Sequence, residues 1–110
     1  MKIGSAMALL AVALVSAPAG AADGMTTAGL RGLCSAQAGT GQRLTCSGYL
    51  VGYVDGAAIV ATTSGRKPWC AKDADIETTF LRYSRAHPEA DANPAAVTIY
   101  SAMTEAYPCK

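Results

Sequence analysis

The amino-acid sequence predicts an all-α fold, a small up-down bundle of about four helices held by two disulfides. Four segments carry apolar residues at helical spacing, and no segment after the first 22 residues alternates with a period of two. Short runs containing glycine or proline separate these segments. The chain of 110 residues also contains an even number of cysteines, four, which is typical of small exported domains with disulfides. This length leaves room for one domain.

The N-terminal segment predicts a signal peptide over residues 1–22. Lys2 gives it a positive start, residues 3–15 are almost unbroken apolar, and residues 16–22 are nearly all small. The apolar run is shorter than the ~20 residues that cross a bilayer. We therefore expect cleavage after Ala21 or Ala22, a single mature domain over residues 23–110, and a periplasmic location.

The first helix is expected to begin at Thr26 or Thr27, because either hydroxyl can cap it. Residues 39–41, Gly-Thr-Gly, break the pattern afterwards. One face of this helix carries Leu30, Leu33, Cys34 and Gln37.

The second helix, from about residue 42 to 62, is the longest and is expected to be the central one. Its predicted core stripe is Cys46, Tyr49, Leu50, Tyr53, Val54, Ala57, Val60 and Ala61. The same helix contains Gly48, Gly52 and Gly56, and each glycine costs about 1 kcal/mol relative to alanine. We expect a neighbouring helix to press against them, from this domain in preference to a twin subunit. Asp55, beside the glycines, is expected to accept a structural hydrogen bond, with a binding carboxylate as the alternative.

The third helix is expected to start with Asp73 as its cap and to carry Asp75 and Glu77 in its first turn, where carboxylates favour the helix dipole. Pro88 ends it. Its apolar face is Ile76, Phe80, Leu81 and Tyr83.

The fourth helix is expected to start with Asn93 as its cap and Pro94 in its first turn. Its buried side is predicted to be Ala96, Ile99, Tyr100, Met103 and Tyr107.

Short connections favour antiparallel neighbouring helices, and this rule predicts the cysteine pairing. Cys34, near the end of the first helix, and Cys46, near the start of the second, fall at one pole. Cys70, before the third helix, and Cys109, after the fourth, fall at the other. We therefore predict the pairs Cys34–Cys46 and Cys70–Cys109, the most economical of the three possible pairings.

Charge and residue types argue against several functions. Loss of Lys2 with the signal leaves eight basic and eight acidic side chains, which gives no electrostatic footprint for nucleic acid or anionic lipid. His87 is the only histidine and no Cys-x-x-Cys occurs, so we expect no metal site and no cofactor. Ser84 lies one turn from His87 but lacks an oxyanion-stabilising context, so we expect no enzyme. We interpret His87 as a residue that satisfies the end of the third helix.

Four sequence motifs, in order, resemble the Rap/Tai family of type VI secretion amidase immunity proteins. Residues 46–55, CSGYLVGYVD, resemble the family's Cys-x-Gly-Tyr-x-x-Gly-x-x-Asp helix. Residues 69–70, WC, come next, followed by FLRY at 80–83 leading to HPE at 87–89, and by YPC at 107–109. The similarity spans residues 33–109.

This resemblance implies a small helical periplasmic protein, commonly dimeric, that binds a peptidoglycan-cleaving amidase effector and covers its papain-like substrate groove. The implied contacts lie in the polar segment 85–94, which could also be a plain interhelical turn. The implied contact residues are Arg85, His87, Glu89 and Asp91, and the implied structural residues are Gly48, Tyr49, Gly52 and Asp55. The competing hypothesis is a general envelope binding protein or an acid-stress-type periplasmic chaperone.

Overall fold

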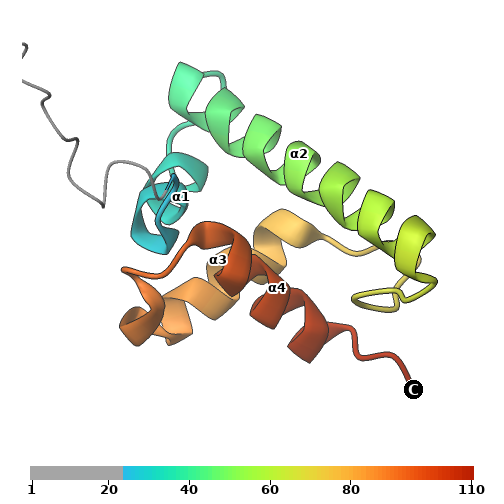
Figure 1. Cartoon of the computed structure of the whole chain (residues 1–110). Coiled ribbons are helices and arrows are strands. Elements are labelled where there is room, and N and C mark those ends of the chain that lie inside the picture. The colour runs from blue at the N-terminus through green and yellow to red at the C-terminus, as the bar shows by residue number, and fades with distance from the viewer. Residues whose placement is uncertain (1–23) are drawn as a thin grey trace, which may run out of the picture.

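The computed structural model describes residues 24–110, so the predicted signal peptide lies outside the described residues. The described chain folds into four α-helices and one short 3-10 helix, and Figure 1 shows how the four α-helices are arranged. The elements in order are α1 (Thr27–Cys34), α2 (Gly41–Ser64), α3 (Ile76–Ala86), the short 3-10 helix η2 (Pro88–Ala90) and α4 (Ala95–Ala106). The prediction of an all-α fold with four helices is confirmed.

Both predicted disulfides are present. Cys34 and Cys46 join the end of α1 to the start of α2, with 5.0 Å between their Cα atoms. Cys70 and Cys109 join the connection before α3 to the chain after α4, with 4.9 Å between their Cα atoms. Short connections therefore brought the pairs together as the packing rule required.

The helix starts follow the capping rules, with two corrections. Thr26 Oγ1 accepts a hydrogen bond from the Gly29 N–H at 3.1 Å and begins α1. The cap of α3 is Asp75 and not Asp73, because the Asp75 carboxylate reaches both the N–H and the hydroxyl of Thr78, at 3.0 and 2.8 Å.

Asn93 does not cap α4, which starts at Ala95 after Pro94 and has no side-chain cap. The backbone supplies the missing partner: the Ala95 N–H donates to the carbonyl of Met25 at 2.9 Å. A carbonyl from the start of the described chain therefore replaces the expected side chain.

The core lies among α1, α3, α4 and the first half of α2. It is formed by Leu30, Cys34, Cys46, Leu50, Phe80, Ala95, Ile99 and Met103. Phe80, Ile99 and Met103 confirm the predicted faces of α3 and α4, whereas Tyr100 is 51% exposed and was wrongly placed inside. Gln37 also falls outside the core, because α1 already ends at Cys34.

The expectation that α2 is the central helix is wrong. Figure 1 shows α2 running along one side of the other three helices. Only Cys46 and Leu50 of α2 are buried, and Val54 and Val60 of the predicted stripe are 38% and 60% exposed. Apolar side chains occur all around α2, as the exposed Ile59 shows. Its periodicity therefore did not single out one buried face.

The glycine stripe of α2 has no neighbour within residues 24–110. A Cβ atom added at Gly48, Gly52 or Gly56 would meet no atom within 4 Å. The expected close contact inside the domain is therefore absent from the described chain, and the space over these glycines is open. Tyr49 packs against the core, while Asp55 is exposed.

The described residues contain one helix, α2, that is long and apolar enough to cross a membrane by length and composition. Its buried residues are part of the domain core, where Cys46 is bonded to α1. A charged residue, Asp55, also stands in its middle. The packing thus places α2 in the helical domain.

Candidate functional site

The candidate contact segment, residues 85–94, is called here the η2 loop. It leaves the end of α3, passes through η2 and leads into α4. Its backbone is bonded to the start of α1: the N–H groups of Thr27 and Ala28 donate to the carbonyls of Asn93 and Asp91, at 2.9 and 3.1 Å. These N–H groups belong to the first helical turn and have no partner inside their own helix. The η2 loop therefore completes α1 while α1 holds the loop.

A bidentate ion pair fixes the middle of the η2 loop. Arg31 on α1 donates from Nη1 and Nη2 to the two oxygens of Asp91, at 2.7 and 2.9 Å. The Arg31 Nη1 also donates to the carbonyl of Ser84 at 3.1 Å. The hydrogen bond and charge of Arg31 hold the pKa of Asp91 below its usual value, and Asp91 raises the pKa of Arg31. Both oxygens of Asp91 are thus used inside the domain.

His87 lies at the C-terminal end of α3, as its interpretation from sequence required. Its ring stacks on Tyr83, with centroids 3.9 Å apart and planes inclined by 15°. Its Nδ1 lies 2.9 Å from the Tyr83 carbonyl oxygen. Because a carbonyl only accepts, Nδ1 is the donor. This contact fixes the orientation of the half-buried ring.

The remaining two predicted contact residues are on the surface of the same loop. Arg85 is exposed and donates from Nη2 to the Ser35 hydroxyl at 3.3 Å. Glu89 is exposed on η2. Arg85 in the last turn of α3, His87 after it and Glu89 on η2 thus follow one another along this segment, and Asp91 is turned to α1.

Sequence reasoning missed Arg31 as the anchor of this loop. Arg31 and Asp91 are separated by 60 positions, and no local motif links them. It also missed Thr27, whose Oγ1 lies 2.7 Å from the Thr98 hydroxyl on α4 in the buried interior. The hydroxyls of these two threonines satisfy one another, so their burial is tolerated.

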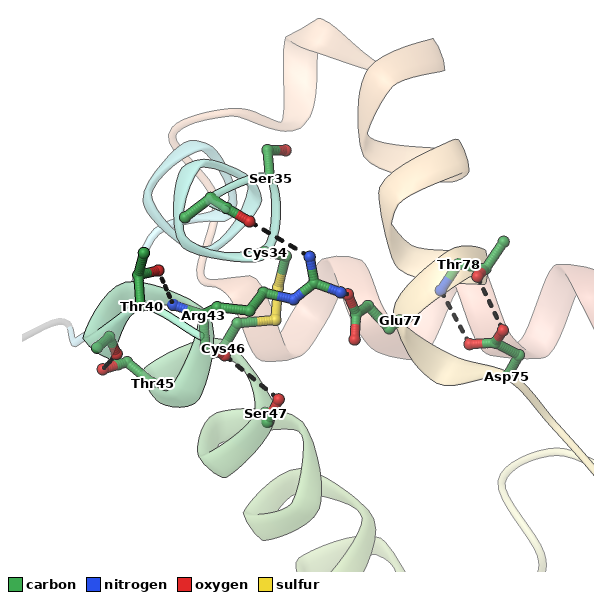
Figure 2. Close-up of a disulfide and its surroundings, with 12 residues drawn as sticks. Cys34, Ser35, Thr40, Arg43, Thr45, Cys46, Ser47, Asp75, Glu77 and Thr78 are labelled. Atoms are coloured by element: carbon green, nitrogen blue, oxygen red, sulfur yellow. Dashed lines mark hydrogen bonds and ion pairs between the residues drawn. A yellow bond between two sulfur atoms is a disulfide. The ribbon is translucent and has the colours of Figure 1, made fainter. Parts of the chain in front are cut away.

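The other pole of α1 is held by the first disulfide and an ion pair. Figure 2 shows the Arg43 side chain reaching from α2 past the Cys34–Cys46 bridge to Glu77 at the start of α3. The Arg43 Nη1 also donates to the carbonyl of Ala36 at 3.4 Å. One guanidinium therefore links α2 to α3 and to the turn after α1.

Residues 24–110 contain no cluster of three histidine, cysteine, aspartate or glutamate side chains placed to hold a metal ion. All four cysteines lie in this range, and each is in a disulfide.

The sequence model of a family described as Rap1a immunity proteins matches residues 26–109. The chain belongs to the Rap1a immunity protein family. The match begins at the cap of α1 and ends at Cys109, so it includes both disulfides and the η2 loop. No match was found among curated proteins or among solved structures.

Membership of the Rap1a immunity family indicates an immunity protein of type VI secretion whose partner is a protein effector. Proteins of this family are generally non-enzymatic and typically periplasmic. The functional question for this chain is therefore which effector it binds and through which surface.

Proposed function

We propose that this Rap1a family protein is a periplasmic immunity protein that binds and blocks a peptidoglycan amidase effector of type VI secretion. The family match over residues 26–109 carries the proposal. The motif order that resembles the Rap/Tai amidase immunity proteins supports the amidase as the effector class. The chemistry of cleavage belongs to the effector, and this chain acts by occupying its surface.

The η2 loop is the proposed contact surface. A loop that blocks a partner binds more tightly when it is already ordered, because less conformational entropy is lost on binding. The Arg31–Asp91 pair, the His87–Tyr83 stack and the backbone bonds to α1 supply this order. In this proposal Arg85, His87 and Glu89 touch the effector, and Asp91 positions the loop.

The test is inhibition of a purified peptidoglycan amidase effector of type VI secretion from the same bacterium. The wild-type chain is expected to bind it with one effector per subunit and to stop peptidoglycan cleavage. The triple variant R85A/H87A/E89A should lose at least about ten-fold in affinity, since truncating even one residue on which an interface depends costs over about 1 kcal/mol. If the triple variant inhibits as well as wild type, the η2 loop is not the contact surface.

We further propose that the chain forms a homodimer through the glycine face of α2. Helix glycines cost about 1 kcal/mol each, and nothing within residues 24–110 uses the space over Gly48, Gly52 and Gly56. Beside Gly56 lies an apolar groove of about 410 Å³, lined by Tyr53, Gly56, Ala57, Val60, Pro68 and Tyr100.

Light scattering after size-exclusion chromatography tests the homodimer. The G52L variant should be monomeric, and its monomer at least as stable as that of wild type, because leucine favours helix and a Cβ atom at this position meets no atom of its own subunit within 4 Å. The variant T45L, which adds the same side chain at another exposed position of α2, serves as the control. A wild-type monomer, or a G52L dimer, would contradict this interface.

The periplasmic location and the single mature domain, residues 23–110, rest on the signal peptide proposed for residues 1–22. Cleavage after Ala21 or Ala22 is the expected result. The intact mass of the exported protein measures this directly, and a chain that keeps Met1 would contradict it.

A second candidate function is a periplasmic binding protein or chaperone for unfolded clients. The exposed apolar residues of α2 favour it: Val51, Ile59 and Val60 are 61%, 64% and 60% exposed. A chaperone should suppress the aggregation of unrelated reduced proteins at comparable molar ratios. An immunity protein should leave that aggregation unchanged and bind one effector.

A further inference from the structure

An apolar groove of about 380 Å³ lies between α2 and the start of α3, away from the η2 loop. Its apolar lining comprises Leu50, Val51, Val54, Ala74 and Ile76. Leu50 is 3% exposed, whereas Val51 and Val54 are 61% and 38% exposed. Covering these partly exposed side chains would remove apolar surface from water, which is favourable.

The rim of this groove carries three carboxylates, Asp55, Asp75 and Glu77. Glu77 is paired with Arg43. Within residues 24–110, neither Asp55 nor Asp75 forms an ion pair. Asp75 accepts two hydrogen bonds from Thr78, and these keep its pKa below the usual value. The rim is therefore negative at neutral pH.

We propose that this groove binds a lysine or arginine side chain that projects from a protein partner. Long basic side chains have an apolar stem and a charged head, so the stem can cover the valines while the head meets the carboxylates. An acidic side chain would be repelled here. A purely apolar one would take the carboxylates out of water without giving them a partner.

The identity of the partner rests on the proposed function, in which it is the amidase effector. The groove lies at the N-terminal end of α3 and the η2 loop leaves its C-terminal end. A helix of 11 residues is about 16 Å long. A standard interface buries about 800 Å² per partner, a patch roughly 30 Å across. One effector can therefore cover both ends of α3.

The double variant D55N/D75N tests the groove against the effector. Asparagine caps a helix about as well as aspartate, so the change removes charge and keeps the start of α3. Affinity for the effector should fall roughly 10- to 100-fold, and its dependence on salt should weaken. Asp73, an exposed carboxylate near the groove that does not line it, supplies the control D73N, which should lose far less affinity than the double variant. Equal affinity of wild type and D55N/D75N would contradict the proposal that this groove binds a basic side chain of the effector.

A second measurement separates the groove from the choice of effector. N-acetyl-arginine amide is titrated into the isotope-labelled exported protein, and N-acetyl-citrulline amide, which has the same shape without the charge, is the control. The arginine compound should shift the methyl signals of Val51, Val54 and Ile76 in a saturable way, with a Kd of the order of millimolar. The citrulline compound and the D55N/D75N variant should show no such shifts.

The outcomes of the two measurements differ for the two proposals. If the arginine compound binds but no amidase does, the proposed function fails and the groove stands. If the amidase binds wild type and D55N/D75N alike, the groove fails and the proposed function stands. Equal shifts from both amides, or no shifts from either, would also contradict the proposed binding of a basic side chain in this groove.

Discussion

The two disulfides occupy opposite surroundings. Cys34 and Cys46 are 1% and 0% exposed and belong to the core, although they are only 12 positions apart. Cys70 and Cys109 are exposed, although they close a separation of 39 positions. In the chain-entropy account the longer loop gives the greater stabilisation. Loop length predicts that the exposed bridge stabilises the domain more, whereas burial predicts that the buried bridge does. The contributions of loop length and of burial can therefore be measured within one small domain.

The largest expected effect is loss of the buried bridge. The variant C34S/C46S should lower the free energy of unfolding by about 5 kcal/mol, because it loses about 3 kcal/mol of loop constraint and leaves two hydroxyls in the core. Urea unfolding followed by circular dichroism measures it. The pair C34A/C46A, which buries no hydroxyl, should be less damaging than C34S/C46S, and equal losses would show that burial plays no part.

Removal of the exposed Cys70–Cys109 bridge should lower the free energy of unfolding by less than removal of the buried bridge, although it closes the longer loop. The variant C70S/C109S should lower the free energy of unfolding by about 4 kcal/mol at most, and C70A/C109A should match it because water solvates either side chain. In partial reduction with dithiothreitol, alkylation should label Cys70 and Cys109 before Cys34 and Cys46, as peptide mapping would show. Labelling of Cys34 and Cys46 first would show that the core does not protect their bridge.

The Arg31–Asp91 pair, which joins α1 to the η2 loop, should give a smaller effect that depends on pH. The folded-state pKa of Asp91 is lowered by Arg31, so its contribution is present above the unfolded pKa of about 3.9 and is lost as the pH falls through the folded pKa. D91N should therefore be less stable than wild type at pH 7 and should approach it under strong acid. Urea midpoints between pH 7 and 2 test this, and a constant difference would exclude the ion pair as the cause.

The smallest change is expected on α2, in the part of the molecule farthest from the core. G56A should raise the free energy of unfolding by up to about 1 kcal/mol, because alanine favours helix and its Cβ meets no atom of the chain. Thermal unfolding at a concentration low enough to give monomer isolates this helix effect. A destabilised G56A monomer would mean that a contact over Gly56 exists inside the subunit.

Much of the fold was predictable because its determinants are local. The capping hydroxyl of Thr26, the stop at Pro88 and the short connections that pair the cysteines all act within a few residues. The position of α2 was not predictable, because this helix carries apolar residues on its buried side, such as Leu50, and also on its exposed side, such as Ile59. Periodicity identifies a buried face only when the other face is polar.

The sequence singled out the segment proposed as the contact, which stays a prediction, but not how the side chains of that segment are arranged. The η2 loop was recognised from its polar residues, and the interpretation of His87 at the end of α3 is confirmed by its bond to Tyr83. The roles within the loop depend on distant partners. Asp91 was expected to face a partner, yet Arg31, far away in sequence, uses both of its oxygens. Side chains brought together only by tertiary packing leave no signal in the local sequence.

The backbone bonds from Thr27 and Ala28 to the carbonyls of Asn93 and Asp91 have a consequence for the order of folding. The first-turn N–H groups of α1 gain these carbonyl partners only when the segment just before α4 is in place, and they bond to water until then. A chain that emerges N-terminus first, from a ribosome or through a translocation channel, therefore stays open at its beginning until its end is nearly clear. This ordering is compatible with the export proposed above, in which the chain crosses a membrane before it folds.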